Sequence, residues 1–193
     1  MLDYVEGKLA KAEPNFAIID LGGWGVKLYI SLSTYNRIRD KKDQTVKLYT
    51  HMVLKDDAVE LYGFSDEVER QAFMLLNRVS GIGPKVAISI LSLMNLSHLK
   101  ASILSEDAGA LATVPGIGKK TAQKIIIELK DRIKDLPVAS DEVTYNSLFE
   151  AKEVLISLGF NPKEIQLALD SASIKSSDSV EDIVKLALKK LSK

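Results

Sequence analysis

Hydrophobic and polar positions alternate along the first third of the chain, as they do in half-buried β-strands. The alternation is clearest on both sides of the Gly22-Gly23-Trp24-Gly25 turn, where glycines permit positive φ angles. Several short strands joined by glycine-rich turns are typical of a small barrel. The strands that this pattern predicts are residues 4–9, 16–21, 26–30, 46–49 and 59–62.

The period changes to that of a helix after residue 64. Ser65 can cap a helix whose first two residues are acidic, and acidic side chains are favourable at the positive N-terminal end. Apolar residues then follow at helical spacing over residues 68–79. Up to residue 133 the pattern predicts short helices broken by glycine pairs, with another cap at Ser105-Glu106-Asp107.

Residues 134–146 lose periodicity and contain a proline, which is typical of a linker. Helical signals return beyond it. A capping box at 147–150 begins one helix, Gly159 suits the left-handed position that ends it, and Asn161-Pro162 begins another. Asp178 opens a third. We therefore expect a multidomain α+β chain with four parts: a β-barrel at 1–63, a helical domain at 64–133, a linker at 134–146 and a three-helix bundle at 147–193.

The composition excludes several kinds of chemistry. The 193 residues include no cysteine, so disulfides, thiol catalysis and cysteine-ligated metals are excluded. His51 and His98 are too few for a multi-histidine centre, and we expect no metal and no cofactor. No apolar run reaches the ~18 residues of a membrane span, and the N-terminus lacks a signal-peptide layout, so we expect a soluble cytoplasmic protein.

The charges balance at 26 basic and 26 acidic side chains, but they are not evenly spread. Residues 64–134 hold 10 basic and 7 acidic side chains, and residues 135–193 hold 7 and 10. A mildly basic centre beside an acidic tail fits an anionic ligand bound in the middle of the chain.

A nine-residue repeat lies in this basic centre. Val79-Ser80-Gly81-Ile82-Gly83-Pro84-Lys85-Val86-Ala87 recurs 35 positions later as Val114-Pro115-Gly116-Ile117-Gly118-Lys119-Lys120-Thr121-Ala122. A Gly-Ile-Gly hairpin buries the isoleucine and leaves the glycine backbone bare, and it leads into a helix N-terminus that favours an anion. Nothing in it reads base edges, so the expected ligand is the sugar-phosphate backbone. The predicted phosphate-binding residues are Gly81, Gly83, Lys85, Gly116, Gly118, Lys119, Lys120 and Lys124.

Two other glycine motifs do not fit. A nucleotide-hydrolysis loop needs glycine at position 113, where threonine stands, and a dinucleotide fingerprint needs a small residue where Val86 and Thr121 stand. The alternative interpretation of each Gly-Ile-Gly hairpin is a tight turn between helices that binds no ligand. Two copies with lysines at equivalent positions disfavour this interpretation. The first hairpin has Pro84 at the position that Lys119 takes in the second hairpin. Proline supplies neither an N–H donor nor a positive charge, so we expect the second hairpin to bind phosphate more firmly.

These residues resemble the tandem helix-hairpin-helix motifs of the RuvA family, the Holliday-junction-binding subunits of bacterial branch-migration complexes. The resemblance covers essentially the whole chain, including Gly7-Lys8, the turn at 20–25, residues 61–64, Lys130-Asp131-Arg132 and the stretch from Ala151 to Leu169. It implies an oligonucleotide-binding-type (OB-like) barrel and a flat homotetramer, or two face-to-face tetramers (an octamer), with four-way junction DNA on the basic face.

The resemblance also implies partners. The tail would dock on RuvB, the hexameric AAA+ motor that uses the ATP, and the RuvC resolvase would act on the same junction. The chain itself would be non-catalytic and would serve recombination, DNA repair and the SOS response. We expect motor contacts from among the apolar tail residues Leu155, Leu158, Phe160, Ile165 and Leu169.

Residues 51–59 resemble the family's loop that carries an acidic pin, with Asp56 and Asp57 as the matching carboxylates. Adjacent carboxylates repel phosphate and would keep strands apart at the crossover. Without the resemblance, two consecutive aspartates are typical of a turn.

Trp24, in the turn at residues 20–25, departs from the residue usual at that place in the family. We interpret it as a packing or assembly contact, with base stacking as the alternative.

Two other functions stay open on the sequence alone. A helix-hairpin-helix glycosylase shares the stretch from Gly116 to Ala122, although the helical part is small for enclosing a flipped base. The other open function is that of an adaptor, in which the tail bundle matters most and the hairpins only pack within the protein.

Overall fold

The computed structural model describes residues 2–55, 58–137, 150–152, 154–170, 172, 174 and 178–191. The chain divides into two compact units, Met1–Pro137 and Val138–Lys193. The first unit includes residues 134–137, the beginning of the predicted linker; residues 138–146 lie outside the described residues.

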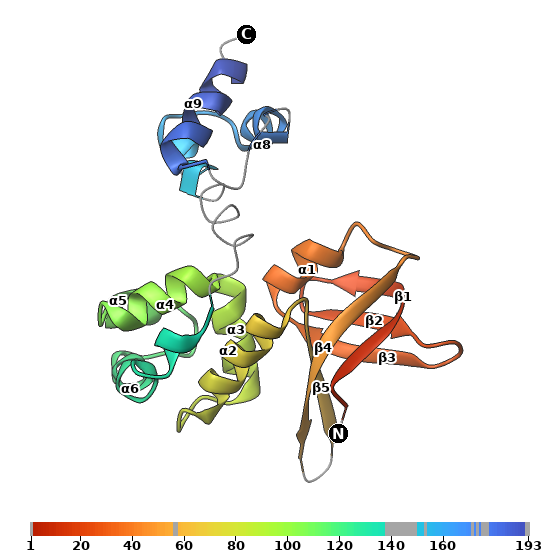
Figure 1. The fold of residues 1–193 in the computed structure, drawn as a ribbon. Coiled ribbons are helices and arrows are strands. Elements are labelled where there is room, and N and C mark those ends of the chain that lie inside the picture. Colours follow the sequence, from red (N-terminus) through yellow and green to blue (C-terminus); the bar gives the residue numbers. More distant parts are fainter. Residues whose placement is uncertain are drawn as a thin grey trace. The chain divides into compact units, whose positions relative to one another are not determined.

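The first unit begins with a closed barrel, formed in its described part by five strands in the order β1-β2-β3-β5-β4 (Figure 1). Neighbouring strands are antiparallel, except for the parallel pair β3 and β5. Alternate residues such as Leu9, Ile19, Leu28 and Leu48 are fully buried inside the barrel, which is why the sequence alternates there. The strands are β1 (Tyr4–Glu13), β2 (Phe16–Asp20), β3 (Gly25–Ile30), β4 (Thr45–Leu54) and β5 (Val59–Phe64).

A short helix that the sequence pattern did not predict, α1 (Leu32–Ile38), connects β3 to β4. Ser31 caps it by accepting the N–H of Thr34 at 3.0 Å. Only Thr34 and Ile38 of this helix are buried, so its seven residues show too little apolar periodicity to be recognised.

The rest of the first unit is helical and surrounds one core with both hairpin isoleucines in it. The cap of α2 is Asp66, one residue later than predicted: its carboxylate accepts the N–H of Glu69 at 2.8 Å, while the N–H of Ser65 donates to Thr34. The cap predicted within Ser105-Glu106-Asp107 is present at the last of these residues, where the Asp107 carboxylate accepts the N–H of Ala110 at 2.9 Å. The helices are α2 (Glu67–Arg78), α3 (Pro84–Leu93), α4 (Leu96–Leu104), α5 (Ala108–Leu111), α6 (Lys119–Leu129) and the 3-10 helix η1 (Ile133–Asp135).

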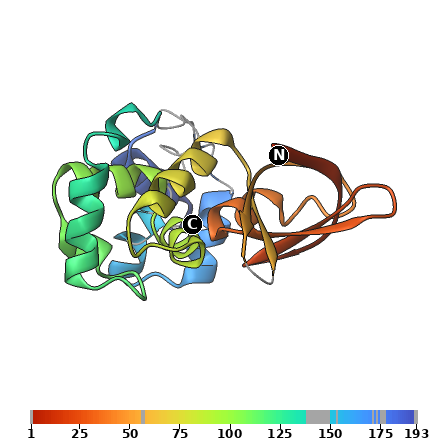
Figure 2. The same cartoon turned by 90° about the horizontal axis from the view of Figure 1, so that it is seen from below.

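Barrel and helices lie side by side in both views of this unit, with α2 between them (Figures 1 and 2). Phe73 of α2 packs against Tyr62 and Phe64 of β5, with ring centroids 5.0 Å apart in each pair. An ion pair of 2.5 Å joins Arg37 of α1 to Asp66. Aromatic packing and this polar contact therefore hold the hairpins to the barrel.

The second unit is helical, with helical residues at 150–152 and 154–157, α8 (Pro162–Asp170) and α9 (Val180–Leu191). Gly159 has φ +91°, as its place after a helix predicts. The cap of α9 is Ser179 rather than Asp178: its hydroxyl accepts the N–H of Asp182 at 3.2 Å and donates to the Asp182 carboxylate at 2.6 Å. The α+β fold class is as predicted.

Candidate nucleic-acid interface

The two predicted hairpins have the same backbone. Gly81 and Gly116 have φ angles of +93° and +88°, a region that side chains strongly disfavour, so both turns need glycine. The next residue in each copy, Ile82 or Ile117, is about 5% exposed or less and anchors the turn in the core.

The hydrogen bonds repeat as well. The N–H of Ile82 donates to the carbonyl of Val79 at 2.9 Å, and the N–H of Ile117 donates to that of Val114 at 3.0 Å. One residue further on, the carbonyl of each second glycine accepts the N–H of the alanine four residues later, Ala87 or Ala122, at 2.9 Å. The sequence repeat is therefore a structural repeat.

The second glycine of each hairpin, Gly83 or Gly118, has ordinary extended geometry, with φ −87° and −86°. A Cβ atom at either position would meet nothing within 4 Å. Both residues are helix N-caps without a side-chain cap, and among the described residues their N–H groups have no acceptor. Neither backbone angle nor packing requires glycine there, so the bare backbone leaves room for something outside the chain.

Positive charge gathers at the same edge. Lys85, Lys119 and Lys120 are exposed, and in the described part of the chain none has a carboxylate within 4.0 Å. Lys124, one turn further along α6, is half-buried and pairs with Glu128 at 3.9 Å, so it is less available than the others. Proline at the first position of α3 leaves the first hairpin with one N–H and one charge fewer than the second.

Comparison with known proteins matches all three parts of the chain. The RuvA N terminal domain matches residues 1–63, the SAM-like Helix-hairpin-helix tandem matches residues 73–131, and the RuvA, C-terminal domain matches residues 150–192. Proteins named Holliday junction branch migration complex subunit RuvA are similar over nearly their whole length. The one from Cytophaga hutchinsonii is 41% identical over 98% of this chain and 99% of the relative, and that from Caldanaerobacter subterraneus subsp. tengcongensis is 39% identical over 100% of both.

The chain belongs to the RuvA family. The resemblance inferred from the sequence is thus confirmed, and so is the order of an OB-like barrel, tandem hairpins and a helical C-terminal domain.

The two residues predicted to form an acidic pin, Asp56 and Asp57, lie outside the described residues. The strands that lead to them, β4 and β5, extend as a two-stranded ribbon, paired as far as Leu54 and Val59 (Figure 1). These two apolar side chains are largely exposed on the ribbon.

The ribbon also carries a charged cluster that sequence reasoning missed. The Lys55 ammonium lies 2.6 Å from the Glu60 carboxylate, which also accepts the Tyr62 hydroxyl at 2.9 Å. These two hydrogen bonds lower the pKa of Glu60, and the charge of Lys85 in the first hairpin lowers it further. The cluster lies toward the tip of the ribbon, where Glu60 pairs with Val53 in the strand register. Only the alternation of Glu60 and Tyr62 on one strand face hinted at it.

The five tail candidates for motor binding separate into two groups. Leu155, Ile165 and Leu169 are buried in the core of the second unit, and Phe160 packs against that core. Leu158 is 58% exposed and is available for contact. Leu167, at 71%, is more exposed still and was not among the candidates, because helical periodicity alone does not show which apolar positions face outward.

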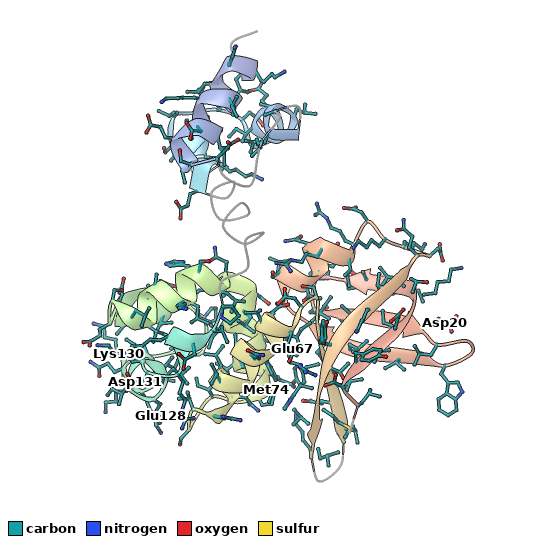
Figure 3. All side chains as sticks on the ribbon, viewed as in Figure 1. Asp20, Glu67, Met74, Glu128, Lys130 and Asp131 are labelled. Atoms are coloured by element: carbon teal, nitrogen blue, oxygen red, sulfur yellow. The ribbon has the colours of Figure 1, made fainter. Side chains whose placement is uncertain are left out.

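Two remaining side chains fall outside the hairpins. His51 packs edge-on against Phe73 at 5.5 Å, and burial followed by the charge of Arg70 lowers its pKa, which fits a structural residue. Lys130, at the end of α6, pairs with Glu106 (Figure 3). Its charge is therefore already partnered, unlike those of the hairpin lysines.

The described residues contain no group of three or more histidine, aspartate or glutamate side chains placed to hold a metal ion. No single helix in the described part of the chain is long and apolar enough to cross a membrane. Helices α3 and α4 reach that length and composition only together, and they are bent by 101° at their junction.

Proposed function

We propose that this chain binds four-way DNA junctions through its two hairpins and serves as the non-catalytic subunit of an ATP-driven branch-migration complex. The carrying observation is the pair of N-cap glycines, Gly83 and Gly118, whose N–H groups are free among the described residues and whose surroundings are open. Each lies at a helix N-terminus, Gly83 near the single lysine Lys85 and Gly118 beside Lys119 and Lys120. This arrangement suits phosphate and provides no contact that reads bases.

The names of the relatives support the junction as the substrate, since they are subunits of Holliday junction branch migration complexes. The second unit would recruit the RuvB motor, with Leu158 and Leu167 as its exposed apolar contacts. Asp56 and Asp57 would keep the strands apart at the crossover. We further propose that the chain acts as a homotetramer or octamer in the cytoplasm, together with RuvC, in recombination and DNA repair.

Gel shift with a synthetic four-way junction and a linear duplex of the same sequence tests this function. We expect tight binding of the junction, weak binding of the duplex, and an affinity that falls by about 0.9 log units per log unit of salt for each phosphate neutralised. Equal weak binding of both DNAs would favour the adaptor, and release of a damaged base would favour a glycosylase.

The second hairpin should contribute more than the first. The double variant Lys119→Gln/Lys120→Gln should weaken junction binding about tenfold or more and reduce the salt slope by about two phosphate contacts, whereas Lys85→Gln should cost less. Lys41→Gln/Lys42→Gln is the matched control, because it removes two adjacent exposed lysines from the barrel. Equal losses for the hairpin and control doubles would contradict a specific phosphate site.

A further inference from the structure

The two strands of the ribbon bracket the Asp56-Asp57 pair closely. Strand pairing extends to Leu54 and Val59, and one residue beyond that pair the N–H of Lys55 donates to the carbonyl of Ala58 at 2.8 Å. Only residues 56 and 57 lie between these two hydrogen-bonded residues. The charge at this end of the ribbon therefore comes from two aspartates and from the lysine that directly precedes them.

The Lys55 side chain directs its charge away from that end. The strand register pairs Glu60 with Val53, which is two positions before Lys55 on β4. The Lys55 ammonium nevertheless lies 2.6 Å from the Glu60 carboxylate, so the two side chains meet diagonally across the ribbon. Because a strand rises ~3.3 Å per residue, the ammonium group is drawn back along the ribbon, toward the barrel.

Glu60 is itself held in place. Lys55 contacts its Oε1 atom, and its Oε2 atom accepts the hydroxyl of Tyr62 at 2.9 Å. Tyr62 is 1% exposed, and its ring packs 5.0 Å from that of Phe73 on α2. Only 12% of the Glu60 side chain is exposed, against 40% of the Lys55 side chain. The carboxylate is thus a fixed acceptor anchored on the core, unlike the mobile partners of an ordinary surface ion pair.

The position of the Lys55 ammonium decides how much negative charge the aspartates present. A lysine has a long flexible stem, and without Glu60 the carboxylates nearest to it in the sequence are those of Asp56 and Asp57. An ammonium group beside them would cancel one of their two charges and weaken the repulsion of a phosphate. With the ammonium on Glu60, both charges remain.

We propose that Glu60 is a positioning residue, which holds the Lys55 ammonium away from Asp56 and Asp57 so that both aspartates act on DNA with their full charge. The inference rests on the proposed function, in which these aspartates keep the strands apart at the crossover. Glu60 need not touch DNA for this role. Two other roles would give different results: an ion pair without functional effect, and direct repulsion of DNA by Glu60.

The ion pair can be tested without DNA. The hydrogen bonds from Lys55 and then Tyr62 lower the pKa of Glu60. In the full-length protein, the carboxyl carbon of Glu60 should therefore titrate at a higher pH in Lys55→Gln than in the wild type, as followed by NMR. An unchanged titration would show that Lys55 is not held by Glu60, and it would overturn the proposal even if the chain binds junctions.

The functional test uses a four-way junction with 2-aminopurine at the crossover, because this base fluoresces more strongly when it is unstacked. Glu60→Gln keeps an acceptor for Tyr62 but lacks the charge that holds Lys55. It should reduce the fluorescence gain on protein binding about twofold and steepen the salt dependence by about one phosphate contact. Lys55→Gln/Glu60→Gln should restore both wild-type values, because no ammonium group is released.

Lys55→Gln alone should stay close to the wild type, since Tyr62 still holds Glu60 two residues away from the aspartates. A reduced signal that persists in the double variant would assign the effect to the charge of Glu60 itself. Equal and opposite changes in the two single variants would mean that only the summed charge matters. Either result would contradict a positioning role.

Glu13→Gln is the matched control. It makes the same change of charge at another lysine–glutamate pair of the barrel, where Lys11 lies 3.2 Å from Glu13, and it should leave the fluorescence gain and the salt dependence as in the wild type. An effect equal to that of Glu60→Gln would count against the proposal. Wild-type protein that binds no junction, or binds it without a fluorescence gain, would instead refute the proposed function, and with it this inference, before any variant is compared.

Discussion

The two glycines in each hairpin have different tasks. The first, Gly81 or Gly116, turns the chain through a positive φ angle. The second, Gly83 or Gly118, has an angle that any residue adopts and open space where a side chain would stand. Stability and ligand binding can therefore be separated by substituting one or the other.

Gly116→Ala should destabilise the protein by about 1–2 kcal/mol, the cost of placing a side chain in the left-handed region. Gly118→Ala should leave stability within about 0.5 kcal/mol and still weaken junction binding about tenfold, because its methyl group keeps the phosphate from the bare backbone. Thermal unfolding and gel shift measure the two effects. Unchanged DNA affinity in a stably folded Gly118→Ala protein would contradict a phosphate site at this cap.

The contact between α1 and α2 depends on a buried carboxyl group. Glu69 is 3% exposed, and it accepts hydrogen bonds from the hydroxyls of Ser31 and, at 2.5 Å, Thr34. Burial raises the pKa of Glu69, and the nearby Asp66 carboxylate adds to this effect. The two hydroxyl bonds oppose the rise without cancelling it. Barrel and hairpins are thus joined through a buried carboxyl group whose pKa is raised by its burial.

This carboxyl group should make stability depend on pH. Between the usual glutamate pKa of about 4.3 and the raised value in the folded protein, the folded state binds a proton that the unfolded state lacks. The free energy of unfolding contributed by Glu69 should therefore fall as pH rises through this window. Glu69→Gln should remove that fall, as measured by thermal unfolding of residues 1–137 at a series of pH values.

Glu128→Gln serves as the control, because it removes a carboxylate from the surface of the same unit, beside Lys130 and Asp131 (Figure 3). The free energy of unfolding of the Glu128→Gln variant should fall with rising pH as much as that of the wild type. If Glu69→Gln also kept that fall, the pH dependence would arise elsewhere and burial of Glu69 would not govern it.

In the proposed function, DNA binding and motor recruitment belong to different units of the chain. Both hairpins, their core and the barrel belong to Met1–Pro137, while the exposed Leu158 and Leu167 belong to the other unit. Each unit has its own hydrophobic core. Each should therefore fold without the other.

Residues 1–137 alone should bind a four-way junction with an affinity within about threefold of the full chain, and they should fail to stimulate the ATPase activity of the motor. Gel shift and an ATPase assay with the purified motor measure the two outcomes. Leu158→Ser with Leu167→Ser in the full chain should reproduce the loss of stimulation with junction binding intact. A truncated chain that still stimulates the motor would place recruitment in the first unit.

Local features of this protein could be predicted because they depend on neighbouring residues. Strand alternation, glycine at the hairpin turns, the left-handed Gly159 and a helix cap within residues 105–107 are set over a few positions of the chain, and the structure confirms them. Short elements were less predictable: α1 has too few buried positions to show a period, and the caps of α2 and α9 each fall one residue later than expected.

Contacts between distant parts of the chain could not be read from the order of residues. Glu69 meets Ser31 and Thr34 across 38 and 35 positions, and no local pattern announces that pairing. Leu155 is buried and Leu158 is exposed, although both are apolar residues of one helical pattern. The hairpin backbone follows from short-range rules of φ and hydrogen bonding, whereas burial and charge pairing depend on which surfaces the folded chain brings together.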